Sequence, residues 1–281
     1  MKSAFGVSLT VLVLASAAQA ADVGKGEQLD KACAAKDMKA CFDAAKMHWR
    51  GDASGWVDWK KAWPAFQAGV NIDPKKALAM HQKGCDGGSA PACYDLGLMH
   101  FNGWGVPKDE VKGTAAYQKA CDRGDAAGCY GLGQSLRQGK GAPKDEAKAL
   151  VAYQKSCDAS YAPGCYKNAY MYEEGLSVAK DVAKALPIYQ KSCDRGDSGA
   201  CGKVGALFED GPTGLAKNEA KAAQFHQRAC DGHNLRSCHK LGLLYEKGAG
   251  VAKDKAKAVA LQQKACEGGF KDACAAGSGT K

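Results

Sequence analysis

The sequence predicts an all-α protein in which a pair of helices repeats along the chain. The chain has 281 residues and 14 cysteines, and the cysteines form seven pairs whose members are eight positions apart. From Cys85 onward, the first cysteine of each pair recurs every 36 or 37 residues. A fixed period of this length is typical of helical repeat arrays. The pairs are Cys33 and Cys41, Cys85 and Cys93, Cys121 and Cys129, Cys157 and Cys165, Cys193 and Cys201, Cys230 and Cys238, and Cys266 and Cys274.

The second helix of each repeat is expected to begin twelve positions before the first cysteine of a pair. An Asp or Asn there can accept a hydrogen bond from a backbone N–H that the first helical turn leaves without a partner. Small and apolar residues follow at helical spacing up to the cysteine. Tyr117, Tyr153 and Tyr189 share one position in this pattern, which predicts packing between repeats. The expected capping residues are Asp73, Asp109, Asp145, Asp181, Asn218 and Asp254.

The first helix of the next repeat is expected to begin just after a glycine and a capping residue, as at Gly124 and Asp125. Glycine ends a helix in the left-handed conformation, and the capping side chain begins the next helix. The second cysteine then falls in the first turn or so of this helix. Its expected ends lie near Gly103, Gly139, Gly175, Gly211 and Gly248. Pro187 falls inside one of the helices that end in the first cysteine of a pair, and it is expected to kink that helix.

The spacing of the cysteines favours disulfides. On one continuous helix, positions eight apart are separated by about 12 Å, whereas a disulfide needs Cα atoms within about 7 Å. A tight turn between two helices brings the two cysteines together. We therefore expect seven local disulfides, each joining consecutive helices, and no thiol left for nucleophilic chemistry.

The rival interpretation is a metal site. The spacing CxxC is absent, but one cluster of histidines and cysteines could suggest ligands. It comprises His226, Cys230, His233, Cys238 and His239. In the repeat register His226 replaces the recurrent tyrosine, and His233 stands at the left-handed position, so no metal and no cofactor is expected.

The first twenty residues predict a secretory signal peptide. Lys2 precedes an apolar run from Val7 to Ala18, and Ala18 and Ala20 resemble a cleavage site. A retained N-terminal anchor is the alternative. No later stretch is apolar enough to cross a bilayer. We therefore expect an exported protein, periplasmic or secreted, in a compartment where disulfides persist.

The composition is that of a folded soluble protein. Hydrophobic residues make up 46% and charged residues 25% of the chain, and the formal net charge is +9. The charges are dispersed along the sequence. This balance permits contact with anionic surfaces but gives no reason to expect nucleic acid as a partner.

Several positions in register resemble the Sel-like repeat (SLR), a relative of the tetratricopeptide repeat. The unit that carries the resemblance reads Cys129-x-x-Leu-Gly, Gly139-x-Gly141, Lys144-Asp145, Lys148-Ala149 and Tyr153-x-Lys155-x-Cys157. Cysteine pairs eight apart are similar to those of the Helicobacter cysteine-rich protein (Hcp) subgroup. The resemblance implies an α/α superhelical solenoid with a concave face. We expect one domain of six helix pairs over residues 21–276, and a tail at 277–281.

The resemblance implies two functions. SLR proteins generally act as protein-binding scaffolds, whereas the Hcp subgroup is described as weak β-lactamases or penicillin-binding proteins. A serine β-lactamase needs Ser-x-x-Lys at the start of a helix, with further motifs. The chain offers Ser177 and Lys180 in an expected loop, where sister repeats carry glycine at the first position. Neither Ser-Asp-Asn nor Lys-Thr-Gly is present, so β-lactam hydrolysis is implied by the resemblance alone.

A tryptophan-rich insertion, about residues 52–68, interrupts the first repeat. It is either a partner-binding lobe or a hydrophobic cap on the end of the array. Its candidate partner-binding residues are Trp56, Trp59, Lys60, Lys61, Trp63 and Phe66. A concave groove offering Asn168, Tyr172 and Tyr245 is a second candidate. We expect a monomeric scaffold for a protein or a peptidoglycan-related envelope ligand, with a β-lactam as the alternative ligand.

Overall fold

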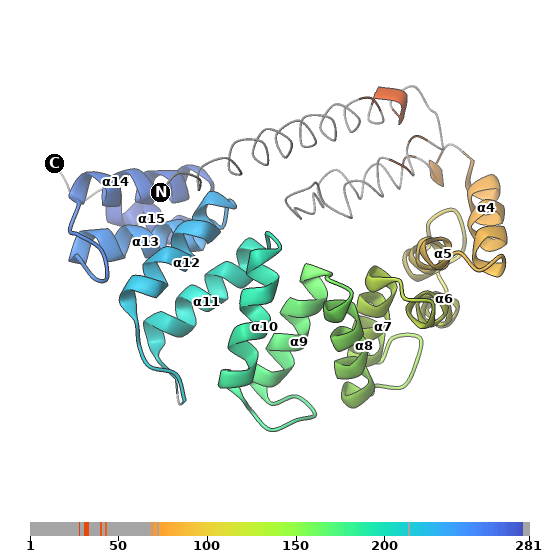
Figure 1. The fold of residues 1–281 in the computed structure, drawn as a ribbon. Helices are drawn as coiled ribbons and strands as arrows, with labels where there is room; N and C mark the ends of the chain where they lie inside the picture. Colours follow the sequence, from red (N-terminus) through yellow and green to blue (C-terminus); the bar gives the residue numbers. More distant parts are fainter. Residues whose placement is uncertain are drawn as a thin grey trace, which may run out of the picture. The chain divides into compact units, whose positions relative to one another are not determined.

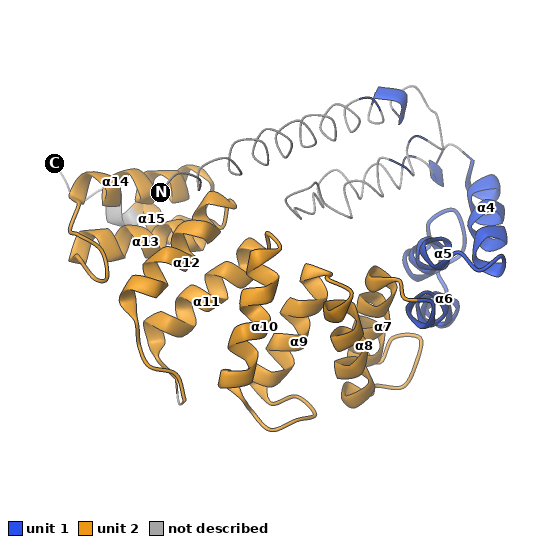
Figure 2. Cartoon of the chain, in the orientation of Figure 1, with its two compact units in different colours: residues 1–123 blue, residues 124–281 orange. Residues whose placement is uncertain are grey.

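The computed structural model of the chain describes residues 73–212 and 214–277, together with residues 28, 31–33, 40, 43, 68, 70 and 71. Over these residues it contains helices and short connections and no strands. The chain divides into two compact units, residues 1–123 and residues 124–281 (Figure 2). Cys41, the signal segment at 1–20 and the insertion residues 52–67 lie outside the described residues.

Helices of nearly constant length follow one another within each unit (Figure 1). Unit 1 contains α4 (Pro74–Asp86), α5 (Ala90–Asn102) and α6 (Glu110–Asp122). Unit 2 contains α7 (Ala126–Gln138), α8 (Glu146–Asp158), α9 (Ala162–Glu174), α10 (Val182–Asp194), α11 (Ser198–Asp210), α12 (Glu219–Asp231), α13 (Leu235–Lys247), α14 (Lys255–Glu267) and α15 (Lys271–Gly277). Within each unit every helix packs against the next helix in sequence, which confirms the predicted array of helix pairs.

The even-numbered helices begin at the predicted capping residues. In each case the side-chain oxygen accepts a hydrogen bond from the backbone N–H three residues later, as in the 2.9 Å contact from Lys148 N to Asp145 Oδ1. The backbone N–H of the same Asp145 donates to the carbonyl of Leu136 at 2.9 Å. The capping residue therefore ties the loop to the preceding helix as well as starting the next one.

The joint between consecutive repeats is a left-handed residue followed by a cap. Gly124 and Gly196 have φ values of 83° and 85°, and Ser160 and His233 adopt the same conformation with φ values of 68° and 62°. Such backbone favours glycine, which explains the glycines in the sister repeats. One expected cap differs, because Tyr161 makes no side-chain cap hydrogen bond at the start of α9. Its ring instead lies 5.6 Å from that of Tyr130.

The recurrent tyrosine of the even-numbered helices packs against a small residue of the preceding helix. A Cβ atom added to Gly133 would lie 2.7 Å from the ring of Tyr153, so only glycine fits without a shift. Both Tyr153 and Tyr189 are fully buried. These tyrosines are packing residues, but the contacts are between the two helices of one pair, α7 with α8 and α9 with α10, whereas packing between repeats is expected from the sequence.

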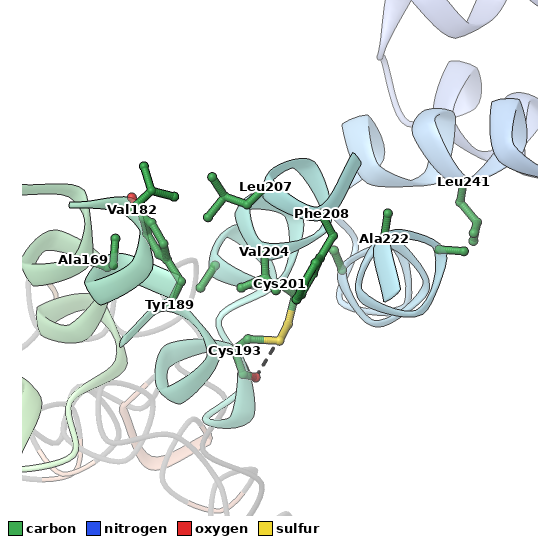
Figure 3. Packing of buried hydrophobic residues seen from close by; sticks show 14 of the residues in the cluster. Ala169, Val182, Tyr189, Cys193, Cys201, Val204, Leu207, Phe208, Ala222 and Leu241 are labelled. Carbon is green, nitrogen blue, oxygen red and sulfur yellow. Dashed lines mark hydrogen bonds between the residues drawn. A yellow bond between two sulfur atoms is a disulfide. The ribbon is translucent and has the colours of Figure 1, made fainter. Parts of the chain in front are cut away.

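One apolar cluster runs through the middle of unit 2. Figure 3 shows it from Ala169 on α9, through Tyr189 and Val204, to Leu241 on α13. Since the cluster does not stop at a repeat boundary, neighbouring repeats share one core, as expected of an array whose units stabilise each other. Helix α10 continues through Pro187 and keeps the common length of 13 residues.

Disulfides lie at the joints between helices. The Cα atoms of each bonded pair are 4.3 to 4.8 Å apart. The pairs are Cys85–Cys93, Cys157–Cys165, Cys193–Cys201, Cys230–Cys238 and Cys266–Cys274. Cys33, Cys121 and Cys129 are disulfide-bonded as well, and no described cysteine is a free thiol.

Candidate interaction face

The candidate binding residues of the insertion and the candidate catalytic pair are considered first. The candidates of the insertion, Trp56, Trp59, Lys60, Lys61, Trp63 and Phe66, lie outside the described residues. Ser177 and Lys180 are exposed in the loop before α10. Ser177 has a φ of 62°, like Gly105 and Gly141 at the same loop position in other repeats, which have φ values of 68° and 70°. No helical turn joins Ser177 to Lys180, so this motif lacks the geometry of a serine β-lactamase.

The odd-numbered helices of unit 2 share one face on which most side chains are only half-buried. Residues three, four and six positions after the second cysteine of each pair are buried, whereas most of those one, two, five and eight positions after it are half-buried. We call this surface the odd-helix face. Its residues are Tyr130, Gln134 and Arg137 on α7, Tyr166, Lys167, Tyr170 and Glu173 on α9, Lys203, Ala206 and Glu209 on α11, and His239, Lys240 and Leu243 on α13.

The groove residues expected from the sequence are only partly on the surface. Asn168 is fully buried, and its Nδ2 donates to Gln154 Oε1 at 2.6 Å. It stands at a position that Leu132 and Val204 occupy in other repeats, so it belongs to the packing between helices and was wrongly expected in a groove. Tyr172 and Tyr245 are half-buried.

Ion pairs connect the odd-numbered helices of consecutive repeats. Lys203 Nζ on α11 lies 3.0 Å from Glu173 Oε1 on α9, and Lys240 Nζ on α13 lies 3.4 Å from Glu209 Oε2 on α11. The lysine comes two positions after its cysteine, and the glutamate eight positions after the cysteine of the preceding repeat. We call these two pairs the charge ladder.

Each glutamate of the charge ladder also faces a buried side chain from an even-numbered helix. Tyr189 Oη donates to Glu173 Oε2 at 2.6 Å, and burial together with this bond raises the pKa of Tyr189 far above its usual value. His226 Nε2 lies 3.5 Å from Glu209 Oε2. Burial lowers the pKa of His226, and the glutamate opposes that shift. A ladder glutamate thus sits between a lysine on the surface and a polar ring in the core.

We call the passage from one odd-numbered helix to the next a step of the ladder. The step between α7 and α9 lacks the ion pair, and we call it the broken step. Arg137 occupies the glutamate position there, and Lys167 stands 30 residues further on, as Lys203 does from Glu173. Burial lowers the pKa of Lys167, and the charge of Arg137 lowers it further, while Asp197 opposes the shift. Within the described part of the chain, neither Arg137 nor Lys167 has a carboxylate within 4 Å.

The core side of this step also differs. Tyr153 takes the place of Tyr189, but its buried Oη makes no hydrogen bond to a carboxylate of the described residues, and Arg137 lies beside it instead. Burial raises the pKa of Tyr153 to about 12, and Arg137 opposes part of that rise. The buried Nε of Arg137 has no hydrogen-bond partner among the described residues either. The broken step therefore carries two cations, places Arg137 beside Tyr153, and leaves the Nε of Arg137 without a hydrogen-bond partner among the described residues.

Aromatic rings lie beside Lys167, and another tyrosine lies on the same helix as Arg137. Lys167 Nζ lies 5.5 Å from the centroid of the Tyr166 ring and 5.9 Å from that of Tyr170. On α7, Gln134 Nε2 donates to Tyr130 Oη at 2.7 Å. All of these side chains are half-buried. Half-buried tyrosines beside positive charges are typical of protein interaction sites.

Neither a group of metal ligands nor a membrane-spanning helix is found among the described residues. Within residues 73–212, 214–277 and the few described before them, no three His, Cys, Asp or Glu side chains are grouped to hold a metal ion. His239 Nδ1 instead lies 2.6 Å from Gln262 Oε1. None of the helices in this part of the chain is long and apolar enough to span a bilayer.

Paired helices of equal length, stapled at their joints and bearing a polar face, define an α-solenoid repeat protein. The model of the Sel1 repeat matches six segments, residues 65–89, 90–125, 126–161, 162–197, 198–234 and 235–270. The chain therefore belongs to the Sel1 repeat family, and the expected Sel-like solenoid fold is confirmed. No match is found among curated proteins.

Solved structures share this fold. A protective antigen of uropathogenic Escherichia coli with an SLR fold is 24% identical, with a TM-score of 0.65 over 88% of this chain and 50% of that chain. This chain thus spans about half the length of that antigen. A Sel1 repeat protein from Oxalobacter formigenes is also 24% identical, with a TM-score of 0.63 over 74% of this chain and 81% of that chain. Cysteine-rich protein B of Helicobacter pylori is 30% identical over 47% of this chain and 95% of its own, with a TM-score of 0.39.

Proposed function

We propose that the protein is an exported scaffold that binds a protein partner at the cell envelope through the odd-helix face. The observation that carries this proposal is the row of half-buried aromatic and charged side chains on α7, α9, α11 and α13. Sel1 repeat proteins are typically interaction scaffolds, and interfaces are enriched in tyrosine and arginine. The tryptophan-rich insertion at 52–68 is a second contact region in this proposal.

Export is supported by the state of the cysteines. Every described cysteine is disulfide-bonded, and such bonds are typical of proteins outside the cytoplasm. The twenty residues that resemble a signal peptide fit the same compartment. Mass spectrometry of the protein recovered from a periplasmic fraction should find Ala21 at the N-terminus. A protein that keeps Met1 and is found in the cytoplasm would refute export.

Site-specific photocrosslinking in cells tests the binding face. A photoreactive phenylalanine analogue at Gln134 or Leu243 should give a discrete crosslinked protein, because both side chains lie on the odd-helix face. Val151 and Val259 are matched controls, since they are exposed on even-numbered helices. Crosslinks from the control positions alone would overturn the assignment of the face.

A further inference from the structure

We propose that the broken ladder step binds a carboxylate of an acidic segment in the protein partner, held between Arg137 and Lys167. This inference rests on the proposed function, because it names a subsite within the odd-helix face. It is carried by the contrast between this step and the two intact steps of the charge ladder.

The intact steps show which chemical group the broken step lacks, namely a carboxylate. At the next step, the carboxylate of Glu173 lies 3.0 Å from Lys203 Nζ and accepts a hydrogen bond from Tyr189 Oη. The equivalent lysine and tyrosine of the broken step, Lys167 and Tyr153, face Arg137 instead. A carboxylate brought by a partner would restore the charge balance that the intact steps achieve within the chain.

The chain itself does not supply that carboxylate from the described residues. Asp197 is the acidic group that acts electrostatically on Lys167, but both of its oxygens are in use. Its Oδ1 accepts from Ala200 N at 3.0 Å to cap α11, and its Oδ2 accepts from Ser192 Oγ at 3.1 Å. Asp197 is also buried enough that its pKa is raised. It is therefore committed to the helix joint.

The chemistry of the two cations suits a carboxylate. A guanidinium offers several N–H donors in a planar fork that matches the two oxygens, and the Nε of Arg137 has no partner within the described part of the chain. Lys167 adds a second donor from the adjacent helix. Burial and the charge of Arg137 lower the pKa of Lys167, so a bound carboxylate would stabilise the charged form of this lysine.

The rings around the cations favour a peptide over a free ion. Tyr130, Tyr166 and Tyr170 supply apolar surface and hydroxyl groups on both helices of the step. A side chain or backbone next to the bound carboxylate would pack against these rings. The net charge of +9 also attracts an acidic segment from a distance.

The test is a binding titration with a fluorescent peptide that alternates glutamate and alanine, against a matched peptide with glutamine in place of glutamate. We expect the glutamate peptide to bind the disulfide-bonded protein in low salt and the glutamine peptide to bind at least tenfold more weakly. Arg137→Gln and Lys167→Gln should each weaken binding of the glutamate peptide about tenfold. Lys155→Gln removes an exposed charge from α8 and should leave binding unchanged.

The possible failures are distinguishable. Equal loss with Lys155→Gln, or no loss with Arg137→Gln and Lys167→Gln, would overturn the subsite. Binding to phosphatidylglycerol vesicles or inorganic phosphate but not to the glutamate peptide would overturn the peptide assignment. Retained melting temperatures would show that the variants fold. If these tests fail while crosslinks at Gln134 persist, the scaffold proposal stands and the acidic-segment inference falls.

Discussion

The step from α7 to α9 and the step from α9 to α11 have the same backbone and different charges. In both, the second cysteine, the small residue and the tyrosine of the following helix occupy equivalent positions. The later step ends in a buried hydrogen bond and a surface ion pair at Glu173. The earlier step has Arg137 there and no carboxylate partner for it among the described residues.

This comparison separates two kinds of position in the repeat. The capping residues, the cysteines and the tyrosines set the helix lengths and the packing, so they recur. The position eight residues after the second cysteine lies at the edge of the surface, where arginine and glutamate fit the same space. Differences in charge can therefore accumulate on the odd-helix face without disturbing the array.

Removal of one disulfide should cost the same at both steps. For Cys157→Ala with Cys165→Ala, and for Cys193→Ala with Cys201→Ala, the free energy of unfolding should fall by about 2.5 kcal/mol, because each pair closes a nine-residue loop. Urea unfolding of each double variant measures the loss. A difference well above 1 kcal/mol between the two would show that the joints are not equivalent.

Loss of the tyrosine hydroxyl should change the free energy of unfolding by different amounts at the two steps. Tyr189→Phe removes a hydrogen bond to a carboxylate and should lower the free energy of unfolding by about 1.5 kcal/mol. Tyr153→Phe should cost less than half as much, since the hydroxyl of Tyr153 faces Arg137 and makes no hydrogen bond to a carboxylate of the described residues. Thermal unfolding of the two single variants provides the measurement. Equal losses would contradict the contrast.

Arg137→Glu should convert the broken step into an intact one. The new carboxylate would face Lys167 and Tyr153, and the free energy of unfolding should rise by about 0.5 kcal/mol, as is usual for a half-exposed ion pair. Salt should weaken this gain. Lys155→Glu, on the exposed side of α8, is the matched change of charge and should lack the effect. A loss of stability with Arg137→Glu would mean that Arg137 supports the fold.

Low pH should lower the stability of the step from α11 to α13 in particular, because His226 stands there in place of the recurrent tyrosine. The pKa of His226 is lowered by burial, so the folded state favours the neutral ring. Its contribution to stability is complete above the ordinary pKa of 6.5 and is lost as the pH falls below it, because the unfolded chain takes up the proton first. His226→Tyr should therefore reduce the loss of stability between pH 7.5 and pH 5. An unchanged pH profile would refute this.

Much of the fold could be predicted because its signals are local. The cap at Asp145 and the left-handed turn at Gly124 each depend on a few neighbouring residues. The charge ladder could have been found as well, since Lys203 and Glu173 hold fixed places in the register. Helical periodicity does not reveal it, because the two residues are 30 positions apart and lie on helices of different repeats. The burial of Asn168 could not be read from a polar residue alone, because its partner Gln154 lies on another helix.

The eight-residue separation of the bonded cysteines also has a consequence for the order of oxidation. A chain that emerges slowly into an oxidising compartment exposes both partners of a joint such as Cys157 and Cys165 almost together, before the next pair appears. The nearest thiol is then the native one, so few wrong pairings compete. A whole repeat can accordingly be inserted or deleted without changing the pairing of the cysteines in the other repeats.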